Sequence, residues 1–248
     1  MKRSFVFVLS AVLIAALLLP ACGPAKQVVT VAMDATWPPF EYTDENQNII
    51  GYDVDLITAI AENQGFEIEI VNVQWDPLLA GMATCQYDVA VSAMTITEER
   101  RQSFNFSEPY FAAGQLIAVA IDNTDVASRD DLGGKTIGVQ LGTTGDIEAQ
   151  SIAGATVKSY DQISLAFLDL MNGQVDAVIA DNTLVYAYVN ENADKIKAVG
   201  DVFTAEEYGI AVCKDKPELL DTINAGLAAI TAEGYLDELN TKWFSGNE

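Results

Sequence analysis

The chain has no histidine and few basic residues. Its 248 residues include 13 lysines and arginines against 36 aspartates and glutamates, which gives a formal net charge of −23 at pH 7. Without histidine, the chain can form neither a His-based catalytic triad nor a histidine metal site. The acidic balance argues against nucleic acid and anionic lipid as partners, since both would be repelled. It weakly favours cationic solutes.

Cysteine is scarce as well, with Cys22, Cys85 and Cys213 as its three occurrences. If the protein is exported, a disulfide between Cys85 and Cys213 is permitted. Two separately buried small side chains explain these residues equally well. The sequence leaves both interpretations open, and it predicts no metal site and no cofactor.

Only one stretch of the chain is long and strongly apolar, residues 5–19, and it follows the basic pair Lys2 and Arg3. It is shorter than the roughly 20 residues that cross a bilayer comfortably. A basic start, an apolar middle and a small residue before the cleavage site are typical of an export signal, here residues 1–21. Removing these residues takes away two bases and no acids, so the formal charge goes from −23 to −25.

The end of this segment, Leu19-Pro20-Ala21-Cys22, resembles a bacterial lipobox. The resemblance implies that Cys22 becomes a lipidated first residue and that residues 22–27 form a tether. A plain secretory signal, or an anchoring helix that is never cut, would explain the same segment.

Beyond the signal, apolar strand patterns alternate with amphipathic helix patterns, which predicts parallel sheets covered by helices. Helices are expected at residues 75–83 and 163–171 and strands at 156–160 and 208–212. Asp53 fits the N-cap of a helix that runs to about residue 64, so its expected role is structural.

Residues 88–100 contain the clearest candidate for a binding site. Residues 89–91 are a short buried strand by composition, and Thr97, Glu98 and Glu99 then begin a helix as a hydroxyl cap followed by two acids. Arg100 lies in the first turn of that helix.

The chemistry of this stretch suits a small molecule that carries a carboxylate and an amine. The guanidinium of Arg100 can bind a carboxylate with two parallel hydrogen bonds. The Ala93 carbonyl and the Thr95 hydroxyl could accept from the amine. Alternatively, Arg100 pairs with a surface acid.

Two further loops present polar groups where a predicted strand ends. Residues 34–40 contain Asp34, Trp37 and two prolines, which forbid regular structure and stiffen the loop. Residues 141–146 form a glycine-hydroxyl loop before a helix, a geometry that points free N–H groups at an anion. The second loop lacks the lysine of a phosphate loop, so a carboxylate fits better than a nucleotide. A threonine-capped helix explains it equally, and core packing would explain Trp37.

The segment Ser-Ala-Met-Thr-Ile-Thr-Glu-Glu-Arg at residues 92–100, followed by residues 104–110, resembles the signature of polar amino-acid-binding proteins of bacterial ABC importers (solute-binding protein family 3). The likeness covers residues 28–243. It implies an α/β, two-lobed periplasmic-binding-protein-like fold of type II, in which each lobe is a mostly parallel sheet flanked by helices. The implied limits are 28–111 plus 208–248 for lobe 1, 115–204 for lobe 2, and 112–114 and 205–207 for the two hinge strands.

The resemblance also implies roles for individual residues. Arg100 and the backbone of Thr143 and Thr144 would hold the ligand carboxylate. The ammonium group would be held by Asp181, Thr95 and the Ala93 carbonyl. The residues expected to face the ligand side chain are Asp34, Trp37, Trp75, Met94 and Gln140. Trp75 could instead anchor its helix on the core, and Asp181 could cap the helix expected at residues 183–189.

These observations predict an extracytoplasmic binding protein that closes on one polar L-amino acid and delivers it to an ABC permease driven by its ATPase. Arginine or lysine is favoured because Asp34 is acidic, and glutamine comes next. The protein is expected to be a non-enzymatic monomer, lipid-anchored outside the cytoplasmic membrane or periplasmic. The alternative is an exported dehydratase-type enzyme on the same scaffold, for which Asp34 is the one candidate catalytic acid.

Overall fold

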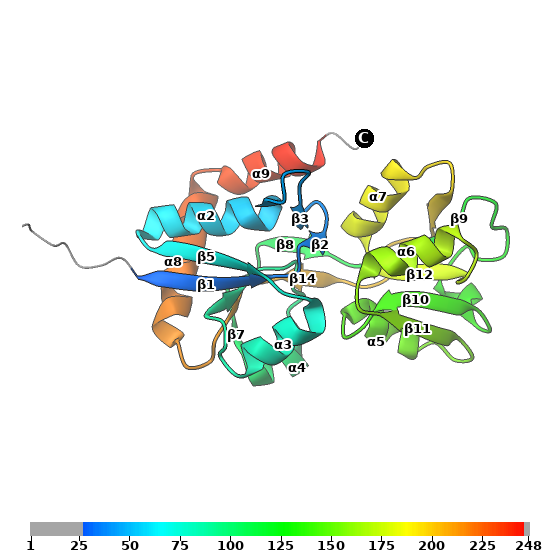
Figure 1. The fold of residues 1–248 in the computed structure, drawn as a ribbon, viewed down its shortest axis with the longest axis horizontal. Helices are drawn as coiled ribbons and strands as arrows, with labels where there is room; N and C mark the ends of the chain where they lie inside the picture. The colour runs from blue at the N-terminus through cyan, green and yellow to red at the C-terminus, as the bar shows by residue number, and fades with distance from the viewer. Residues whose placement is uncertain (1–26, 246–248) are drawn as a thin grey trace, which may run out of the picture.

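The structure is a computed structural model that describes residues 27–245. Strands and helices alternate along the chain and build two lobes, each around its own five-stranded sheet (Figure 1). The two-lobed α/β fold expected from the sequence is therefore confirmed. Within residues 27–245, no helix has both the length and the apolar composition needed to cross a membrane. The predicted signal peptide and Cys22 lie outside the described residues.

The first lobe contains a sheet with the strand order β5-β1-β6-β15-β7. Its β5 and β6 pair with β1 in parallel, whereas β15 runs antiparallel between β6 and β7. The strands are β1 (Val28–Met33), β5 (Glu67–Asn72), β6 (Val89–Ala90), β7 (Asn105–Phe106) and β15 (Ala211–Val212). A small sheet of β2 (Thr36–Trp37), β3 (Glu41–Thr43) and β4 (Ile49–Ile50) adjoins it. The first sheet is thus completed by a strand from near the end of the chain.

Within residues 27–245, five helices belong to the first lobe. They are α2 (Tyr52–Gln64), α3 (Trp75–Ala83), α4 (Glu98–Ser103), α8 (Pro217–Ala232) and α9 (Tyr235–Phe244). The bounds of α3 are those predicted. Asp53 is not the N-cap of α2, because Gly51 holds that position with a φ of 143° that an L side chain rarely adopts. Asp53 lies one residue inside the helix and is completely buried.

The second lobe contains a sheet with the strand order β11-β10-β12-β9-β13. Its strands are β9 (Gln115–Ala120), β10 (Thr136–Gln140), β11 (Thr156–Tyr160), β12 (Ala177–Asp181) and β13 (Ile196–Val199). Its helices are α5 (Thr144–Gln150), α6 (Ile163–Met171), α7 (Asn182–Glu191) and the short 3₁₀ turn η2 (Arg129–Leu132). The predicted bounds of β11 and α6 match. Every strand of this sheet comes from one continuous stretch of chain.

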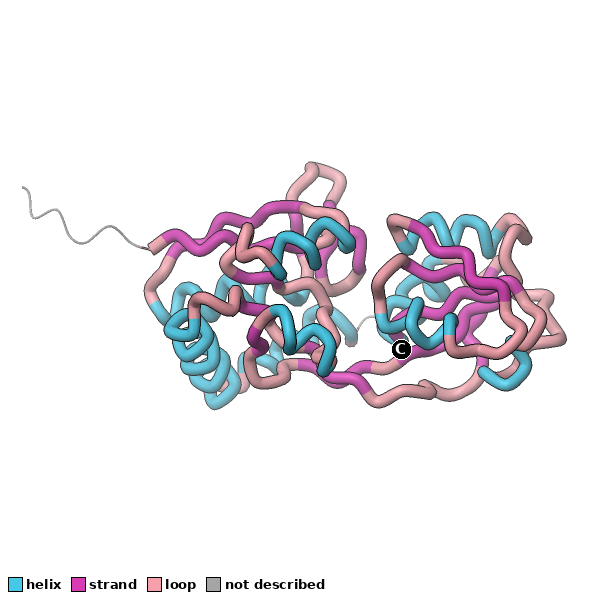
Figure 2. Tube along the Cα trace, turned by 90° about the horizontal axis from the view of Figure 1, so that it is seen from below, coloured by secondary structure: helices cyan, strands magenta, loops and turns pink. Residues whose placement is uncertain are grey.

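The two lobes are joined along one side by extended chain, as Figure 2 shows from below. Strands β8 (Phe111–Ala113) and β14 (Glu206–Tyr208) pair antiparallel in this region. The single strand predicted at residues 208–212 is broken at Gly209, where an added Cβ would come within 2.8 Å of the Ile96 side chain. No observation tests the predicted lobe limits, which stay a prediction.

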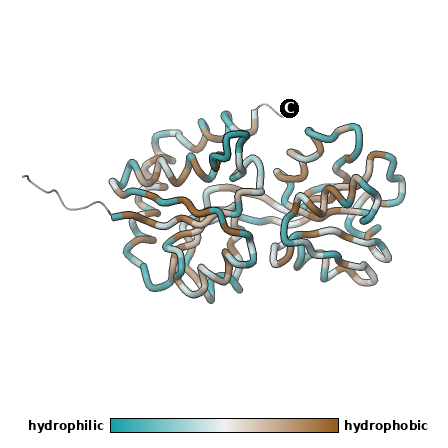
Figure 3. Tube along the Cα trace, viewed as in Figure 1, coloured by the Kyte–Doolittle hydropathy of each residue, from teal (hydrophilic) through white to brown (hydrophobic). Residues whose placement is uncertain are grey.

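Hydrophobic chain follows the strands inside each lobe, whereas the outer loops are hydrophilic (Figure 3). Val29, Val31 and Val89 are completely buried in the first lobe, and Ile137 and Val178 are completely buried in the second. Because both faces of each sheet are covered, these strands are apolar runs and show no strict alternation. One hydrophobic cluster joins buried residues of the first lobe, such as Val29 and Val31, to buried residues of the second, such as Val178.

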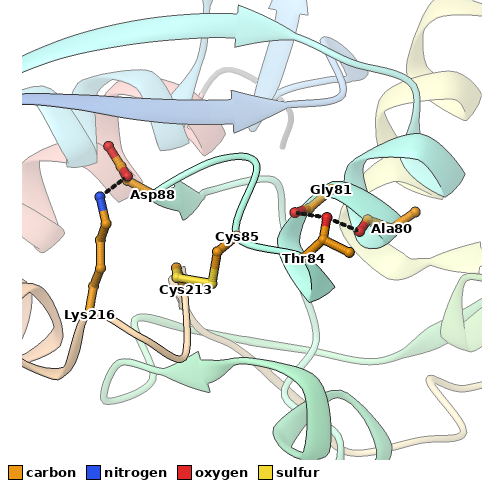
Figure 4. The surroundings of a disulfide bond; sticks show 7 residues. All are labelled: Ala80, Gly81, Thr84, Cys85, Asp88, Cys213 and Lys216. Atoms are coloured by element: carbon orange, nitrogen blue, oxygen red, sulfur yellow. Dashed lines mark hydrogen bonds and ion pairs between the residues drawn. A yellow bond between two sulfur atoms is a disulfide. The ribbon is translucent and has the colours of Figure 1, made fainter.

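A disulfide joins Cys85, just after α3, to Cys213, just after β15 (Figure 4). Their Cα atoms are 5.1 Å apart, although 128 positions separate them along the chain. Close by, Lys216 forms an ion pair with Asp88, and Asp88 also accepts from the Thr30 N–H at 2.9 Å. Of the two interpretations left open by the sequence, the structure supports the disulfide.

Candidate functional site

A cavity lies between the lobes and is lined by residues of both. The lining residues are Asp34, Trp37, Glu41, Trp75, Ser92, Ala93, Thr95, Arg100, Gln140, Thr143, Thr144 and Asp181. Ten of the eleven residues predicted from the sequence are among them, and Met94 is not. The ends of β1, β6, β10 and β12 thus meet at one place, as expected for carboxyl ends of strands in open α/β sheets.

Arg100 is held in place from three sides. Its guanidinium donates to the Thr95 carbonyl at 2.8 Å and to the Gly142 carbonyl of the second lobe at 3.2 Å. It also lies over the Trp75 ring, 5.0 Å from the centroid. Burial lowers the pKa of Arg100 to about 10, against the raising effect of the charges on Asp181 and Glu206. Among the ion pairs within residues 27–245 none includes Arg100, so the alternative of a surface ion pair does not hold.

Asp181 ends β12 on the other side of the cavity. Its side chain does not cap α7. Instead, Oδ1 accepts from Gln115 Nε2 at 2.6 Å and Oδ2 accepts from the Tyr208 hydroxyl. Burial, and then the charge of Glu206, raise the pKa of Asp181 to about 7. A cationic group in the cavity would favour the ionised form and lower that pKa.

The two tryptophans are both packed in the core and part of the cavity wall. Trp37 is 7% exposed and Trp75 is 6% exposed. The indole Nε1 of Trp75 donates to the Gly142 carbonyl at 3.1 Å, the same oxygen that Arg100 contacts. The sequence posed core packing and cavity lining as alternatives, whereas in the structure each ring does both.

Asp34 and Gln140 meet across the two lobes. Gln140 Nε2 donates to Asp34 Oδ2 at 2.8 Å, and the Thr36 hydroxyl donates to Asp34 Oδ1 at 2.9 Å. Burial raises the pKa of Asp34, and the hydrogen bonds from Gln140 and Thr36 oppose that shift. Both oxygens of Asp34 have donors, so it is not the unpaired acid that the enzyme alternative requires.

The glycine-hydroxyl loop lies in the cavity wall, and its two threonines differ. Thr143 caps α5, since its hydroxyl accepts from the Asp146 N–H at 3.2 Å. The Thr144 hydroxyl donates to Glu206 Oε2 at 2.9 Å. The threonine-capped helix considered from the sequence is therefore present, and it lies in the same wall that was expected to hold a carboxylate.

Met94 does not line the cavity, which corrects the prediction that it faces a ligand. Its side chain is completely buried in a core cluster with Leu78 and Phe104. The preceding residue, Ala93, has a φ of 42°, in the left-handed region. This backbone reversal places Ala93 at the cavity and sends the next side chain into the core.

Two lining residues were missed from the sequence, Glu41 and Ser92. Ser92 Oγ donates to Glu41 Oε1 at 2.7 Å and accepts from the Asp34 N–H at 3.0 Å. Glu41 is completely buried, and burial together with the charge of Asp53 raises its pKa well above the ordinary value. A weak signal existed, because Glu41 directly follows the loop that carries Asp34 and Trp37.

Asp53 supports this group from beneath the cavity. Its Oδ2 accepts from the Ala93 N–H at 2.7 Å and from the Tyr110 hydroxyl at 2.9 Å. The left-handed turn at Ala93 is thereby held by a buried carboxylate. This is the structural role of Asp53, in place of the helix cap predicted for it.

Comparisons with known proteins agree with this geometry. Residues 29–246 match the family of bacterial extracellular solute-binding proteins, family 3. This chain belongs to that family. The match spans both sheets and every residue that lines the cavity.

Individual relatives of this solute-binding protein bind amino acids. The L-cystine-binding protein TcyJ of Escherichia coli (strain K12) is 30% identical over 90% of this chain and 84% of its own. An ancestral arginine-binding protein bound to arginine superposes with a TM-score of 0.85 at 41% identity, over 88% of this chain and 99% of its own. The arginine-, lysine-, histidine-binding protein ArtJ of Geobacillus stearothermophilus has a TM-score of 0.84 at 38% identity, over 90% of this chain and 97% of its own. These relatives are binding proteins, so nothing among them supports the enzyme alternative.

The buried carboxylates of this solute-binding protein predict that the ligand-free protein becomes more stable on mild acidification. The pKa of Asp53 is raised by burial from 3.8 to about 6. Because the folded pKa is above the unfolded one, the stabilisation is complete below about pH 4 and is lost as the pH rises through about 6. For Asp53 alone the whole loss is on the order of 3 kcal/mol, and about half of it falls between pH 5 and pH 8.

Urea unfolding of ligand-free protein between pH 5 and pH 8 measures this effect. The free energy of unfolding should fall toward pH 8, and Asp53→Asn should flatten the dependence. Exposed aspartates with a lowered pKa, such as Asp131, act in the opposite direction only below about pH 4. A stability that rises from pH 5 to pH 8 would contradict the prediction.

Proposed function

We propose that this protein binds one basic L-amino acid between its lobes, arginine or lysine, with glutamine as the next best ligand. The observation that carries the proposal is a single cavity lined by Arg100 and Asp181 from opposite lobes. A free amino acid carries a carboxylate for the first and an ammonium group for the second. Burying both ligand charges is tolerable because each meets an opposite, hydrogen-bonded charge.

The preference for a cationic side chain rests on the rest of the lining. Asp34 and Glu41 supply two carboxyl groups, and Trp37 and Trp75 supply aromatic walls. Aromatic faces attract a guanidinium or ammonium group, and a carboxylate binds it with charge-assisted hydrogen bonds. Apart from Arg100, no base lines the cavity within the described residues, so a ligand with an acidic side chain has no partner there.

In the cell, the closed protein would dock on an ABC permease whose ATPase drives import. Ligand contacts to both lobes favour closure, since only the closed state makes all of them. The proposal includes hinges at residues 112–114 and 205–207, a monomeric state, and a lipid anchor on Cys22. Mass spectrometry of the mature N-terminus tests the anchor.

A melting scan with each amino acid tests the ligand. A ligand at 100 times its dissociation constant stabilises by about 2.7 kcal/mol. The largest shifts are expected for arginine and lysine, followed by glutamine. Glutamate or cystine as the best ligand would contradict the proposed preference, and no shift with any amino acid would contradict the function.

The matched variant is Glu41→Gln, which keeps the shape of the side chain and its bond to Ser92. It should weaken the binding of arginine about tenfold or more and change the binding of glutamine little, because the variant loses a charge-assisted hydrogen bond to the cationic side chain. Isothermal titration calorimetry with both ligands gives the ratio directly. Equal losses of affinity for arginine and glutamine would show that Glu41 does not interact with the charge of the ligand side chain.

A further inference from the structure

Glu206 lies outside the cavity lining, on β14 between the two lobes, and its carboxylate receives hydrogen bonds from both of them. Oε2 accepts from the Thr95 hydroxyl of the first lobe at 2.7 Å and from the Thr144 hydroxyl of the second at 2.9 Å. Oε1 accepts from Gln115 Nε2 at 3.1 Å and from the Thr204 hydroxyl at 2.8 Å. Two carboxylate oxygens offer about four acceptor sites, so these four donors use all of them.

Contacts between the lobes at other points involve residues that line the cavity. Gln140 meets Asp34, and Gly142 accepts from Arg100 and Trp75. A ligand could rearrange any of these contacts when it enters. Glu206 differs because it is not itself a lining residue, although its partners Thr95 and Thr144 are. It can therefore hold the lobes together while a ligand occupies the cavity.

The geometry points to Glu206 as an interlobe latch, a positioning residue that holds Thr95 and Thr144 together in the closed state and thereby slows ligand release. This role rests on the proposed function and concerns a residue that does not itself line the cavity. A hydroxyl that donates to Glu206 turns its lone pairs away from that carboxylate. The Thr95 oxygen is then oriented as an acceptor, as an ammonium ligand requires.

Alternation along β14 explains why this residue and not its neighbour has the role. Glu206 and Tyr208 point to the same side of the strand, and the Tyr208 hydroxyl donates to Asp181. Glu207 points to the opposite side and is exposed. One face of a three-residue strand thus supports both Asp181 and the two threonines.

The charge of Glu206 also acts on the proposed ligand groups. It raises the pKa of Asp181 and that of Arg100. Among the ion pairs within residues 27–245 none includes Glu206, so its carboxylate is stabilised by hydrogen bonds from neutral donors. Neutral donors on both lobes hold the carboxylate in the closed arrangement, and opening removes at least one of them.

The test compares Glu206→Gln with Glu207→Gln, which removes the same charge from the exposed face of the same strand. L-arginine affinity is measured by calorimetry, and the dissociation rate by stopped-flow fluorescence. Glu206→Gln should weaken the binding of arginine about tenfold or more, mainly through faster dissociation. The reason is that the variant loses hydrogen bonds to a charged group, and these bonds form only in the closed state. Glu207→Gln should stay within about twofold of the wild type.

A double-mutant cycle separates the latch from a general loss of packing. Thr144→Val should accelerate dissociation in the wild type and have little further effect in Glu206→Gln, since both changes break the same contact. Additive effects, or an unchanged dissociation rate in Glu206→Gln, would overturn the latch. If Glu206→Gln does not fold, Thr144→Val is measured alone, because its hydroxyl is one of the donors that Glu206 Oε2 receives; an unchanged dissociation rate in Thr144→Val would then overturn the latch. Wild-type protein that binds no amino acid would instead refute the proposed function.

Discussion

Replacing Arg100 by lysine should weaken the binding of L-arginine by a hundredfold or more, a loss of about 3 kcal/mol. The guanidinium of Arg100 is fixed by the carbonyls of Thr95 and Gly142 and by the Trp75 ring. A lysine ammonium cannot reproduce the planar fork or bind a carboxylate with two parallel bonds. The substitution would also place a flexible, strongly hydrated charge in a buried position.

Calorimetric titration with L-arginine measures this loss, and Arg101→Lys is the control. Arg101 is the next residue of α4, is exposed and does not line the cavity. Its replacement should leave the affinity within about twofold. If Arg100→Lys also bound arginine within tenfold of the wild type, Arg100 would not hold the ligand carboxylate.

Removing the disulfide should lower the free energy of unfolding by about 5 kcal/mol, since the bond closes a very long loop of the unfolded chain. Cys85 and Cys213 are 128 positions apart. The bond ties the end of α3 to the strand that completes the first sheet. Chain entropy therefore predicts a cost near the upper end of the range for disulfides.

Urea unfolding of the Cys85→Ser/Cys213→Ala double variant measures the cost. Wild-type protein unfolded under a reducing agent should show the same loss, which controls for the side-chain changes. The affinity for arginine should change little, because neither cysteine lines the cavity. A loss below about 1 kcal/mol would mean that the unfolded chain is not constrained by this bond.

The sequence predicted the parts of the site that depend on local pattern. Arg100 and Asp181 each follow a short apolar run and a change to polar residues, and both lie in the same cavity. Helix α3 begins at Trp75 as expected, since its apolar spacing is a local pattern. Where a short segment determines its own conformation, its end could be located without knowledge of its neighbours.

The remaining parts depend on partners far away in the chain. Glu206 contacts Thr95 across 111 positions, and Ser92 contacts Glu41 across 51. The register that pairs Trp37 with Glu41 across β2 and β3 decides which way Glu41 points. Composition and spacing do not contain this information.

Met94 shows a different limit. The family resemblance implied that Met94 faces the ligand, but Ala93 adopts a left-handed φ held by the buried Asp53 carboxylate. Alanine rarely adopts this conformation, so the residue type at this position did not indicate a left-handed turn. The side chain that follows therefore points into the core and away from the cavity.

The position of β15 within its sheet has a consequence for the order in which the polypeptide matures. Strand β6 lacks a neighbour on one side until Ala211 and Val212 have been synthesised, because β15 fits between β6 and β7. The sheet of the second lobe needs only residues 115–199. The lobe that begins the chain is thus the last to be finished, and until then its unpaired strand edge is open to any passing partner, including a chaperone.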